Sequence, residues 1–411
     1  MKLLHVSDLH IGKAVCEFSM IDDQKHILQQ IIDMARAHHV DALLVAGDIY
    51  DKSSPSAEAV SLVDWFLTQL ATHHIKTFMC AGNHDSAERI AYANSLLQNN
   101  GIYISPVFGE NCEKDASKTN VAHYTLEDEY GPVTFWLIPF VKPAHVRGLF
   151  PDADIESYTD ALVAVCNDCC IDTTQRNVAL VHQFVTATGT STERSESELN
   201  LGGLDNVDFH AFDAFDYVAL GHIHGPQRIG RDTCRYSGTP LKYSASEVRQ
   251  HKSACLITLG EKDPTQSTIE YELLPYQPLH DMRAIRGTLE ELTSTEVLNA
   301  ANPHDYVHVT LTDETIPANA MQLLRRHYPN VMSLMVDNQQ THAQGALSQS
   351  VENLSSERKN PLDYFADFFE LQAGKPLAEA QLDIAKTELE ELLDTELSLT
   401  PSCNNNVSCN D

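Results

Sequence analysis

The stretch CAGNHDS, residues 80–86, follows the apolar run IKTFM and places Asn83 and His84 directly after a strand-like segment. Gly, Asn and Asp are common turn residues, so a simple turn is one interpretation of this stretch. Four other apolar runs end in a similar way, since they lead into Asp8 and His10, Asp48 and Asp51, His182, and His222 and His224. Five strand ends with metal-binding residue types favour a shared site over five unrelated turns.

Two segments between these runs have the period of an amphipathic helix. Apolar residues recur at spacings of three and four, first at Ile27, Leu28, Ile31, Ile32 and Ala35 and then at Val60, Val63, Phe66, Leu67 and Leu70. Ser54 and Pro55 suit the cap and first turn of the second helix. Alternating strands and helices predict parallel pairing, in which ligands bind beyond the carboxyl ends of the strands. We therefore expect the polar strand ends to share one edge.

The composition predicts a globular protein of more than one domain. The chain has 411 residues, of which 43% are hydrophobic, enough for a sizeable core. The first ten residues, MKLLHVSDLH, reach an acid and a His after a very short apolar run, which is far from a signal peptide or a membrane span. We expect a cytoplasmic protein with no membrane association and with its ten cysteines reduced.

The charge balance argues against a protein that coats nucleic acid regardless of sequence. Lys and Arg number 28 against 58 Asp and Glu, which gives a formal net charge of -30. Residues 226–252 differ from the rest, because they hold two acids and six bases, namely Arg228, Arg231, Arg235, Lys242, Arg249 and Lys252. A phosphate-facing patch and a solvated surface loop both explain this segment, and charge alone does not separate them.

The residue types at the strand ends indicate a metal-dependent reaction. Carboxylate, amide and imidazole groups without thiolate suit Mn²⁺, Fe²⁺ or Zn²⁺ better than Ca²⁺. Their number exceeds what one ion needs, and two ions roughly 3.5–4 Å apart are typical of phosphoester hydrolysis. The sequence therefore predicts a dinuclear phosphoesterase.

Five sequence blocks occur in order through His224: D-x-H, G-D-x-x-D, G-N-H-D, a later His and G-H-x-H. Together they resemble the calcineurin-like metallophosphoesterase superfamily. The resemblance implies an α/β fold with a four-layer αββα core.

Within that superfamily, HVSDLHIGK, GDIYDKSSPS, LGHIHGPQRI and YSGTPLKYSASE resemble the SbcD-type nuclease subunits of bacterial SbcCD complexes, least specifically after residue 260. The resemblance implies a double-strand exonuclease and a single-strand or hairpin endonuclease in DNA repair, recombination and replication. It also implies two divalent ions, most often Mn²⁺, an SbcC-type coiled-coil ATPase as partner, and a homodimer within a heterotetramer. A free-standing metallophosphoesterase for nucleotides or phosphoproteins is the alternative, and a scaffold without activity is disfavoured because every ligand position is filled.

The resemblance also assigns roles to individual residues. One ion would be held by Asp8, His10, Asp48 and His224, and the other by Asp48, Asn83, His182 and His222, so that Asp48 bridges them. His84 would donate a proton to the leaving oxygen. Asp51, where the archaeal and eukaryotic relatives tend to have His, matches the phosphatase branch and is expected to pair with His84; an exposed loop acid is the other interpretation.

The rest of the chain is expected to carry attachments to a nuclease domain of residues 1–275. These are a small α/β cap that contacts DNA (276–340), a linker (341–360), helices that bind the partner (361–396) and a disordered tail (397–411). A purely structural add-on and tail helices packed on their own domain are the alternatives. Phe365, Phe368 and Phe369 give the first tail helix an aromatic face. No G-x-x-x-x-G-K-[ST] motif occurs, so ATP dependence would come from the partner.

Overall fold

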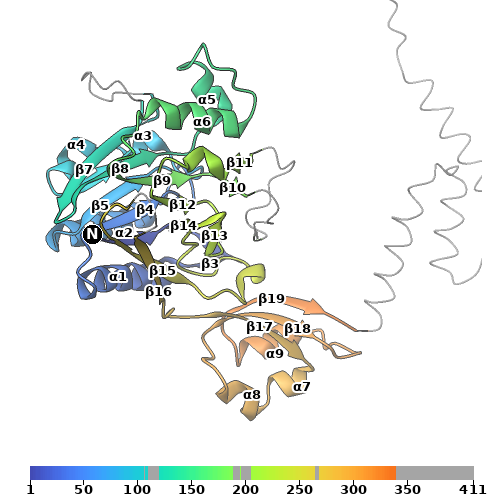
Figure 1. The fold of residues 1–411 in the computed structure, drawn as a ribbon. Coiled ribbons are helices and arrows are strands. Elements are labelled where there is room, and N and C mark those ends of the chain that lie inside the picture. Colours follow the sequence, from blue (N-terminus) through green and yellow to red (C-terminus); the bar gives the residue numbers. More distant parts are fainter. Residues whose placement is uncertain (106, 110–119, 188–194, 196–204, 264–267, 339–411) are drawn as a thin grey trace, which may run out of the picture. The chain divides into compact units, whose positions relative to one another are not determined.

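The computed structural model describes residues 1–105, 107–109, 120–187, 195, 205–263 and 268–338 (Figure 1). The expected linker, partner-binding helices and tail lie outside the described residues, as do the last two residues of the expected cap.

The first of two large sheets has the strand order β16-β15-β1-β4-β5-β6. Its parallel part consists of β1 (Lys2–Val6), β4 (Ala42–Ala46), β5 (Lys76–Cys80) and β6 (Ile102–Ile104). The antiparallel edge is formed by β15 (Ser253–Leu259), which pairs with β1, and by β16 (Ile269–Pro275). The parallel pairing that the alternating pattern predicts is therefore confirmed for β1, β4 and β5.

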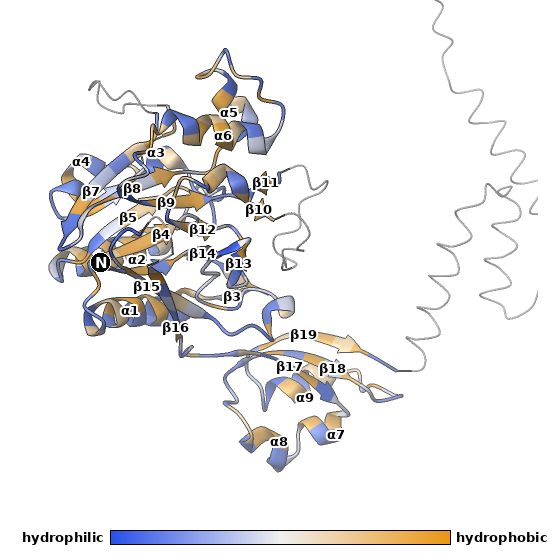
Figure 2. Cartoon of the chain, in the orientation of Figure 1, coloured by the Kyte–Doolittle hydropathy of each residue, from blue (hydrophilic) through white to orange (hydrophobic). Residues whose placement is uncertain are grey.

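Helices α1 (Ile21–Ala37) and α2 (Ala57–Thr72) provide the crossovers between these strands, and the short α3 (Ala87–Ile90) and α4 (Asn94–Gln98) lead into β6. The predicted stripe on α1 is buried, and Figure 2 shows hydrophobic and hydrophilic residues mixed along this helix. The prediction for the start of α2 was wrong, because Ser56 is its N-cap and accepts a hydrogen bond from Ala59 N at 3.2 Å. Val60, expected in the apolar stripe of this helix, is 45% exposed.

The second large sheet has the order β13-β14-β12-β9-β8-β7. These strands are β7 (Ala122–Asp128), β8 (Gly131–Ile138), β9 (Arg176–His182), β12 (Tyr217–Gly221), β13 (Gln227–Ile229) and β14 (Arg231–Tyr236). Helices α5 (Pro143–Arg147) and α6 (Tyr158–Asp168) lie between β8 and β9 in the chain, and the 3₁₀ turns η2 (Phe209–Phe212) and η3 (Ala245–Glu247) precede β12 and β15. Two small ribbons pair β2 (Ala14–Val15) with β3 (Phe18–Ser19), and β10 (Val185–Thr186) with β11 (Val207–Asp208).

Three buried clusters show how the layers stack. The central cluster joins the two sheets, and in it Phe78 of β5 stacks on Phe135 of β8 with ring centroids 4.3 Å apart. A second cluster packs the first sheet against α1 and α2, and a third packs the second sheet against α6. The order helix, sheet, sheet, helix confirms the expected αββα core. It also means that the five strand ends belong to two sheets, three to the first and two to the second.

A smaller sheet, β17-β18-β19, follows β16. Its strands are β17 (Met282–Gly287), β18 (Tyr306–Leu311) and β19 (Val331–Val336), with α7 (Leu289–Leu292), α8 (Thr295–Asn299) and α9 (Ala320–Arg325) between them. Residues 288–299 form two short helices, and the side chain of Ser294 caps the second of them at Val297 N. Residues 311–317 and 336–338 are the described part of a second compact unit, in which Asp337 N donates to Leu311 O at 2.8 Å. Among the described helices, none has the length and apolar character to cross a membrane.

Candidate metal centre

The polar ends of five strands meet in one cluster. Asp8 and His10 follow β1, Asp48 follows β4, Asn83 and His84 follow β5, His182 ends β9, and His222 and His224 follow β12. These strands come from both large sheets, so the cluster forms where the carboxyl ends of the two sheets meet. The structure thus brings together all seven residues proposed as metal ligands.

The first group consists of Asp8, His10 and His224. One potential ligand atom from each lies within 4.8 Å of the other two, and all three side chains are buried. The Nε2 atoms of His10 and His224 are 3.3 Å apart. This is the composition expected for one of the two ions, with Asp48 as the fourth member.

Asp48 lies between this first group and a second group that consists of Asn83, His182 and His222. Its Oδ2 atom is 3.7 Å from Nε2 of His10 and 3.3 Å from Nε2 of His182. On the far side, Oδ1 of Asn83 is 3.0 Å from Nε2 of His182 and 2.9 Å from Nδ1 of His222. The distances suit a carboxylate shared by two cations, each with imidazole and oxygen ligands.

The protonation of His10 and the burial of Asp8 also fit cations. Burial lowers the pKa of His10 well below its usual value, so this ring is neutral and offers a lone pair. Burial and the charge of Asp48 raise the pKa of Asp8 to about 6, although nearby His182 and His224 oppose the shift. Nδ1 of His10 has no hydrogen-bond partner within the described part of the chain. Two buried carboxylates beside a neutral imidazole are a donor set that divalent cations would satisfy.

The backbone at the cluster is strained and tightly packed. Asp8, His10, Asp48 and His222 all have positive φ, of 52°, 45°, 49° and 110°. A Cβ atom on Gly82 would lie 2.1 Å from Oδ1 of Asp48, and one on Gly221 would lie 1.7 Å from the main-chain oxygen of Ala46. The glycines before Asn83 and His222 are therefore required for the strand ends to approach one another.

The expected pair between the Asp51 carboxylate and His84 is not what the structure shows. Nδ1 of His84 lies 2.9 Å from the main-chain oxygen of Asp51, whereas the Asp51 carboxylate lies 2.7 Å from Nζ of Lys13. The ammonium of Lys13 attracts the carboxylate away from the imidazole, and the carbonyl takes its place. Asp51 therefore orients His84 through its main chain, and the exposed-acid interpretation fails as well, because its side chain is only 12% exposed.

Two acids with structural contacts at the cluster were missed. Asp85 accepts hydrogen bonds from the main-chain N–H groups of Ile49, Tyr50 and Gly82, at 3.1, 2.9 and 2.9 Å, and so ties the turn after β4 to the turn after β5. Glu247 contacts His224, with Nδ1 3.2 Å from Oε1. Burial favours the neutral acid, but the hydrogen bond from His224 and the charge of Lys252 outweigh it and hold the pKa of Glu247 well below its usual value. Both acids belong to sequence blocks that were recognised, G-N-H-D and YSGTPLKYSASE.

Most of the basic residues in 226–252 have partners inside the chain. Lys252 lies 2.7 Å from Glu247, Lys242 lies 2.8 Å from Asp281, and Arg228 lies 3.0 Å from Asp232. Arg235 is buried with its guanidinium 3.8 Å from the ring centre of Tyr271. Much of the positive charge of this segment therefore balances acids of the same chain.

Comparisons with known proteins identify the family of this chain. The calcineurin-like phosphoesterase family matches residues 1–226, and the SbcD C-terminal family, described as the type 5 capsule protein repressor C-terminal domain, matches residues 278–373. The SbcD subunit of the SbcCD nuclease from Staphylococcus epidermidis is 30% identical over 403 residues, which cover 96% of this chain and 100% of that protein.

Solved structures of low sequence identity also align with the chain. A protein from Thermus thermophilus is 13% identical and covers 66% of this chain and 98% of its own, with a TM-score of 0.36. A dimetal phosphatase from Danio rerio is 10% identical and covers 67% of this chain and 99% of its own, also with a TM-score of 0.36.

Proposed function

Since this chain belongs to the calcineurin-like phosphoesterase family and, within it, to the SbcD family, we propose that its strand-end cluster holds two divalent metal ions and cleaves DNA. The chain is a metal-dependent phosphodiester hydrolase of the SbcCD nuclease type. The observation that carries the proposal is the position of the Asp48 carboxylate between His10 and His182.

The seven ligands would divide into two overlapping sets. Asp8, His10, Asp48 and His224 would hold one ion, and Asp48, Asn83, His182 and His222 the other. Two bound cations would offset the negative charge that develops on the phosphoryl oxygens. We propose Mn²⁺ as the metal, since oxygen and imidazole ligands without thiolate suit it.

His84 would supply the proton for the leaving oxygen. Its Nδ1–H donates to the main-chain oxygen of Asp51, which leaves Nε2 to carry the transferred proton. The main-chain N–H of His84 donates to Oδ1 of Asp48 at 2.9 Å, so the ring and the bridging carboxylate are held in fixed relation. Asp51 is a positioning residue in this scheme, acting through its carbonyl.

We also propose the DNA substrates of this chain and the assembly in which it acts. The substrates would be DNA duplex ends, hairpins and single strands, and the small unit after residue 275 would serve as the cap. The partner would be an SbcC-type coiled-coil ATPase bound through residues 361–396, with two copies of this chain in a heterotetramer. A cytoplasmic location is part of the same proposal.

The test is cleavage of an end-labelled hairpin duplex by the full chain, alone and with its ATPase partner. We expect products with added Mn²⁺, fewer with Mg²⁺, and none with a chelator. Hydrolysis of nucleotides or phosphoproteins with no cleavage of duplex or hairpin DNA would favour the free-standing phosphoesterase instead.

A further inference from the structure

Glu247 is a carboxylate in the protein interior, 0% exposed, at the end of η3. Each of its two oxygens contacts a different pair of side chains. Oε1 lies 3.2 Å from Nδ1 of His224 and accepts from Ser244 Oγ at 3.0 Å. Oε2 accepts from Nζ of Lys252 at 2.7 Å and from Thr239 Oγ1 at 3.3 Å. A buried charge with this many contacts is fixed in orientation, and one of its fixed contacts is an imidazole of the metal centre.

The contact determines which nitrogen of His224 carries the ring proton. A carboxylate can only accept, so Nδ1 must donate, and in a neutral ring Nε2 is then left with its lone pair. Nε2 is the atom that faces the first metal group, 3.3 Å from Nε2 of His10. His10 has no such carboxylate contact, because its Nδ1 atom is 3.7 Å from Oδ1 of Asp51.

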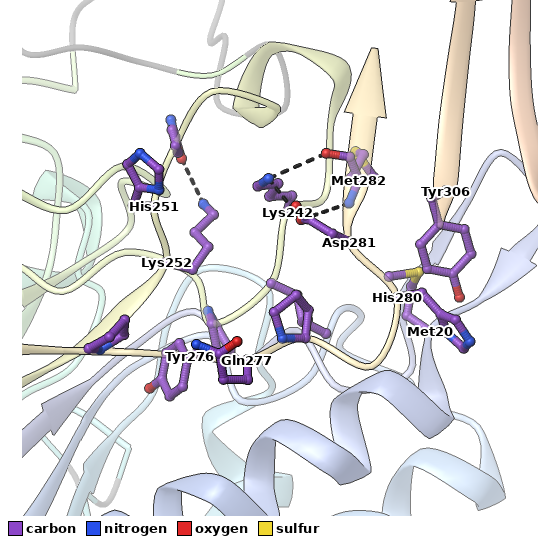
Figure 3. Close-up of a pocket in the computed structure, with 15 residues that line it drawn as sticks. Met20, Lys242, His251, Lys252, Tyr276, Gln277, His280, Asp281, Met282 and Tyr306 are labelled. Atoms are coloured by element: carbon purple, nitrogen blue, oxygen red, sulfur yellow. Dashed lines mark hydrogen bonds and ion pairs between the residues drawn. The ribbon is translucent and has the colours of Figure 1, made fainter. Parts of the chain in front are cut away.

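Lys252 holds the carboxylate in this orientation. Besides Glu247, its Nζ donates to the main-chain oxygen of His224 at 2.9 Å and to Thr239 Oγ1 at 2.6 Å. Its side chain lines a cavity of about 210 Å³, beside His251 and with Lys242 and Asp281 elsewhere on the wall (Figure 3). Because an ammonium group donates and never accepts, it requires an acceptor at Oε2 and leaves Oε1 for the imidazole.

We propose that Glu247 is a positioning residue that fixes His224 in the Nδ1–H tautomer, so that its Nε2 lone pair is available to the metal, and that Lys252 holds the Glu247 carboxylate in place. The inference rests on the proposed metal centre. It adds two residues that would not bind the metal themselves, because Glu247 contacts Nδ1 of His224 and not Nε2. The hydrogen bonds and burial of Glu247 carry it.

The decisive variant is Glu247→Gln, which keeps the size of the side chain. Its amide has one accepting oxygen and one donating NH₂ group. Lys252 attracts the oxygen, which turns the NH₂ toward Nδ1 of His224 and forces that nitrogen to accept. The ring proton then moves to Nε2, where it blocks the metal, and we expect about 10- to 100-fold weaker binding of one ion.

The double variant Glu247→Gln with Lys252→Met separates this effect from simple loss of packing. Without the ammonium, the amide oxygen is free to face Nδ1 of His224, and the metal-binding tautomer returns. We expect the double variant to recover most of the lost affinity, whereas a merely structural role predicts further damage from the second change. Lys252→Met alone keeps the carboxylate and should keep the tautomer.

Two measurements on the full chain test the proposal. Long-range ¹H–¹⁵N correlation spectra of the metal-free chain report the His224 tautomer, which should be Nδ1–H in the unchanged chain and Nε2–H in Glu247→Gln. Mn²⁺ titration by calorimetry reports affinity and stoichiometry. Glu270→Gln, an exposed acid on β16, is the matched control and should change neither.

An unchanged tautomer and unchanged affinity in Glu247→Gln would overturn the inference, and so would a double variant that binds no better than the single one. If the unchanged chain still binds Mn²⁺ and cleaves DNA, either result refutes only the role of Glu247 and leaves the proposed metal centre standing. If the unchanged chain binds no divalent metal, the metal centre itself is refuted, and this inference fails with it.

Discussion

His84 lies close enough to the cluster to be either a ligand or a proton donor. One of its ring nitrogens is within 4.8 Å of potential ligand atoms of His10 and Asp48, while Nδ1 is occupied by the main-chain oxygen of Asp51. We expect His84→Ala to retain two Mn²⁺ equivalents and to lose about 10²- to 10⁴-fold in the cleavage rate, because only the proton transfer is removed. Metal analysis and single-turnover cleavage measure the two effects. His304→Ala, an exposed histidine, is the control; loss of one metal equivalent in His84→Ala would make His84 a ligand.

Asp51 gives a prediction that depends on which of its groups meets His84. Asp51→Asn removes the carboxylate that contacts Lys13 but keeps the main-chain oxygen that contacts His84. We therefore expect the single-turnover rate to fall by far less than the ~10⁴-fold loss known when an Asp–His pair takes the wrong tautomer. A loss of that size would show that the carboxylate itself acts on His84 during the reaction.

The contrast between the ligands and their supports shows what residue patterns can predict. Asp8, His10 and Asp48 were found because strands of one sheet bring their carboxyl ends to one edge. The partner of His84 and the role of Glu247 were missed, because spacing along the chain does not determine which oxygen of an acid faces which nitrogen. That choice depends on Lys13 and Lys252, which are distant in sequence from the histidines that they affect.

At the level of secondary structure, the turn after β5 is packed against the turn after β4. A methyl group on Gly82 would lie 2.1 Å from Oδ1 of Asp48 and 2.3 Å from its main-chain N. We expect Gly82→Ala to displace Asp48, to weaken the binding of both ions and to cost ~1–3 kcal/mol of stability, as overpacking usually does. Gly148→Ala is the matched control, since nothing lies within 4 Å of its Cβ position. Mn²⁺ titration and thermal unfolding decide; full metal content in Gly82→Ala would mean that the turn adapts.

An ion pair links β7 to β9 across the second sheet. Asp128 accepts hydrogen bonds from both terminal nitrogens of Arg176, and this contact holds the pKa of Asp128 well below its usual value. Since the pKa is depressed in the folded chain, the stabilisation exists above the unfolded value of about 3.9 and is lost as the pH falls toward the folded value.

We therefore expect Asp128→Asn to lower the melting temperature near neutral pH, and the difference from the unchanged chain to shrink as the pH falls below about 4. Melting curves across the acid range test this. The exposed Asp152→Asn should show no comparable difference at any pH. A deficit in Asp128→Asn that stayed constant with pH would assign the loss to packing rather than to charge.

Strands and helices with strong periodicity could be predicted, but their ends and partners could not. The apolar runs before Asp8, Asp48 and Asn83 are strands of one sheet, yet the runs before His182 and His222 belong to another. Nothing in a short buried run states which sheet it joins, because its neighbours lie far away in the sequence. The start of α2 was misplaced by two residues, since Ser54 and Ser56 are the same residue type and their side chains suit an N-cap equally well in sequence.

For the whole molecule, the catalytic and partner-binding parts of the chain are expected to be separable. All proposed ligands lie at or before His224, whereas Phe365, Phe368 and Phe369 lie outside the described residues and are assigned from the sequence pattern. Three aromatic residues on one expected short helix after an expected polar linker suit an interface, because such anchors commonly dominate binding.

We expect the double variant Phe365→Ala with Phe368→Ala to weaken capture of the SbcC-type ATPase by ~2 kcal/mol or more and to abolish ATP-stimulated cleavage. Metal-dependent cleavage of simple substrates should persist, since the metal centre is untouched. ATP stimulation should be lost because the sequence has no G-x-x-x-x-G-K-[ST] motif of its own. The control is Tyr92→Ala, which removes an aromatic side chain that is 82% exposed on the described part of the chain. Pull-down with the ATPase and the hairpin assay give the two readouts. If the double variant and a truncation before Pro361 both retained the partner at full strength, the contact would have to lie in the first 360 residues, and the ATPase would reach the metal centre through the catalytic part itself.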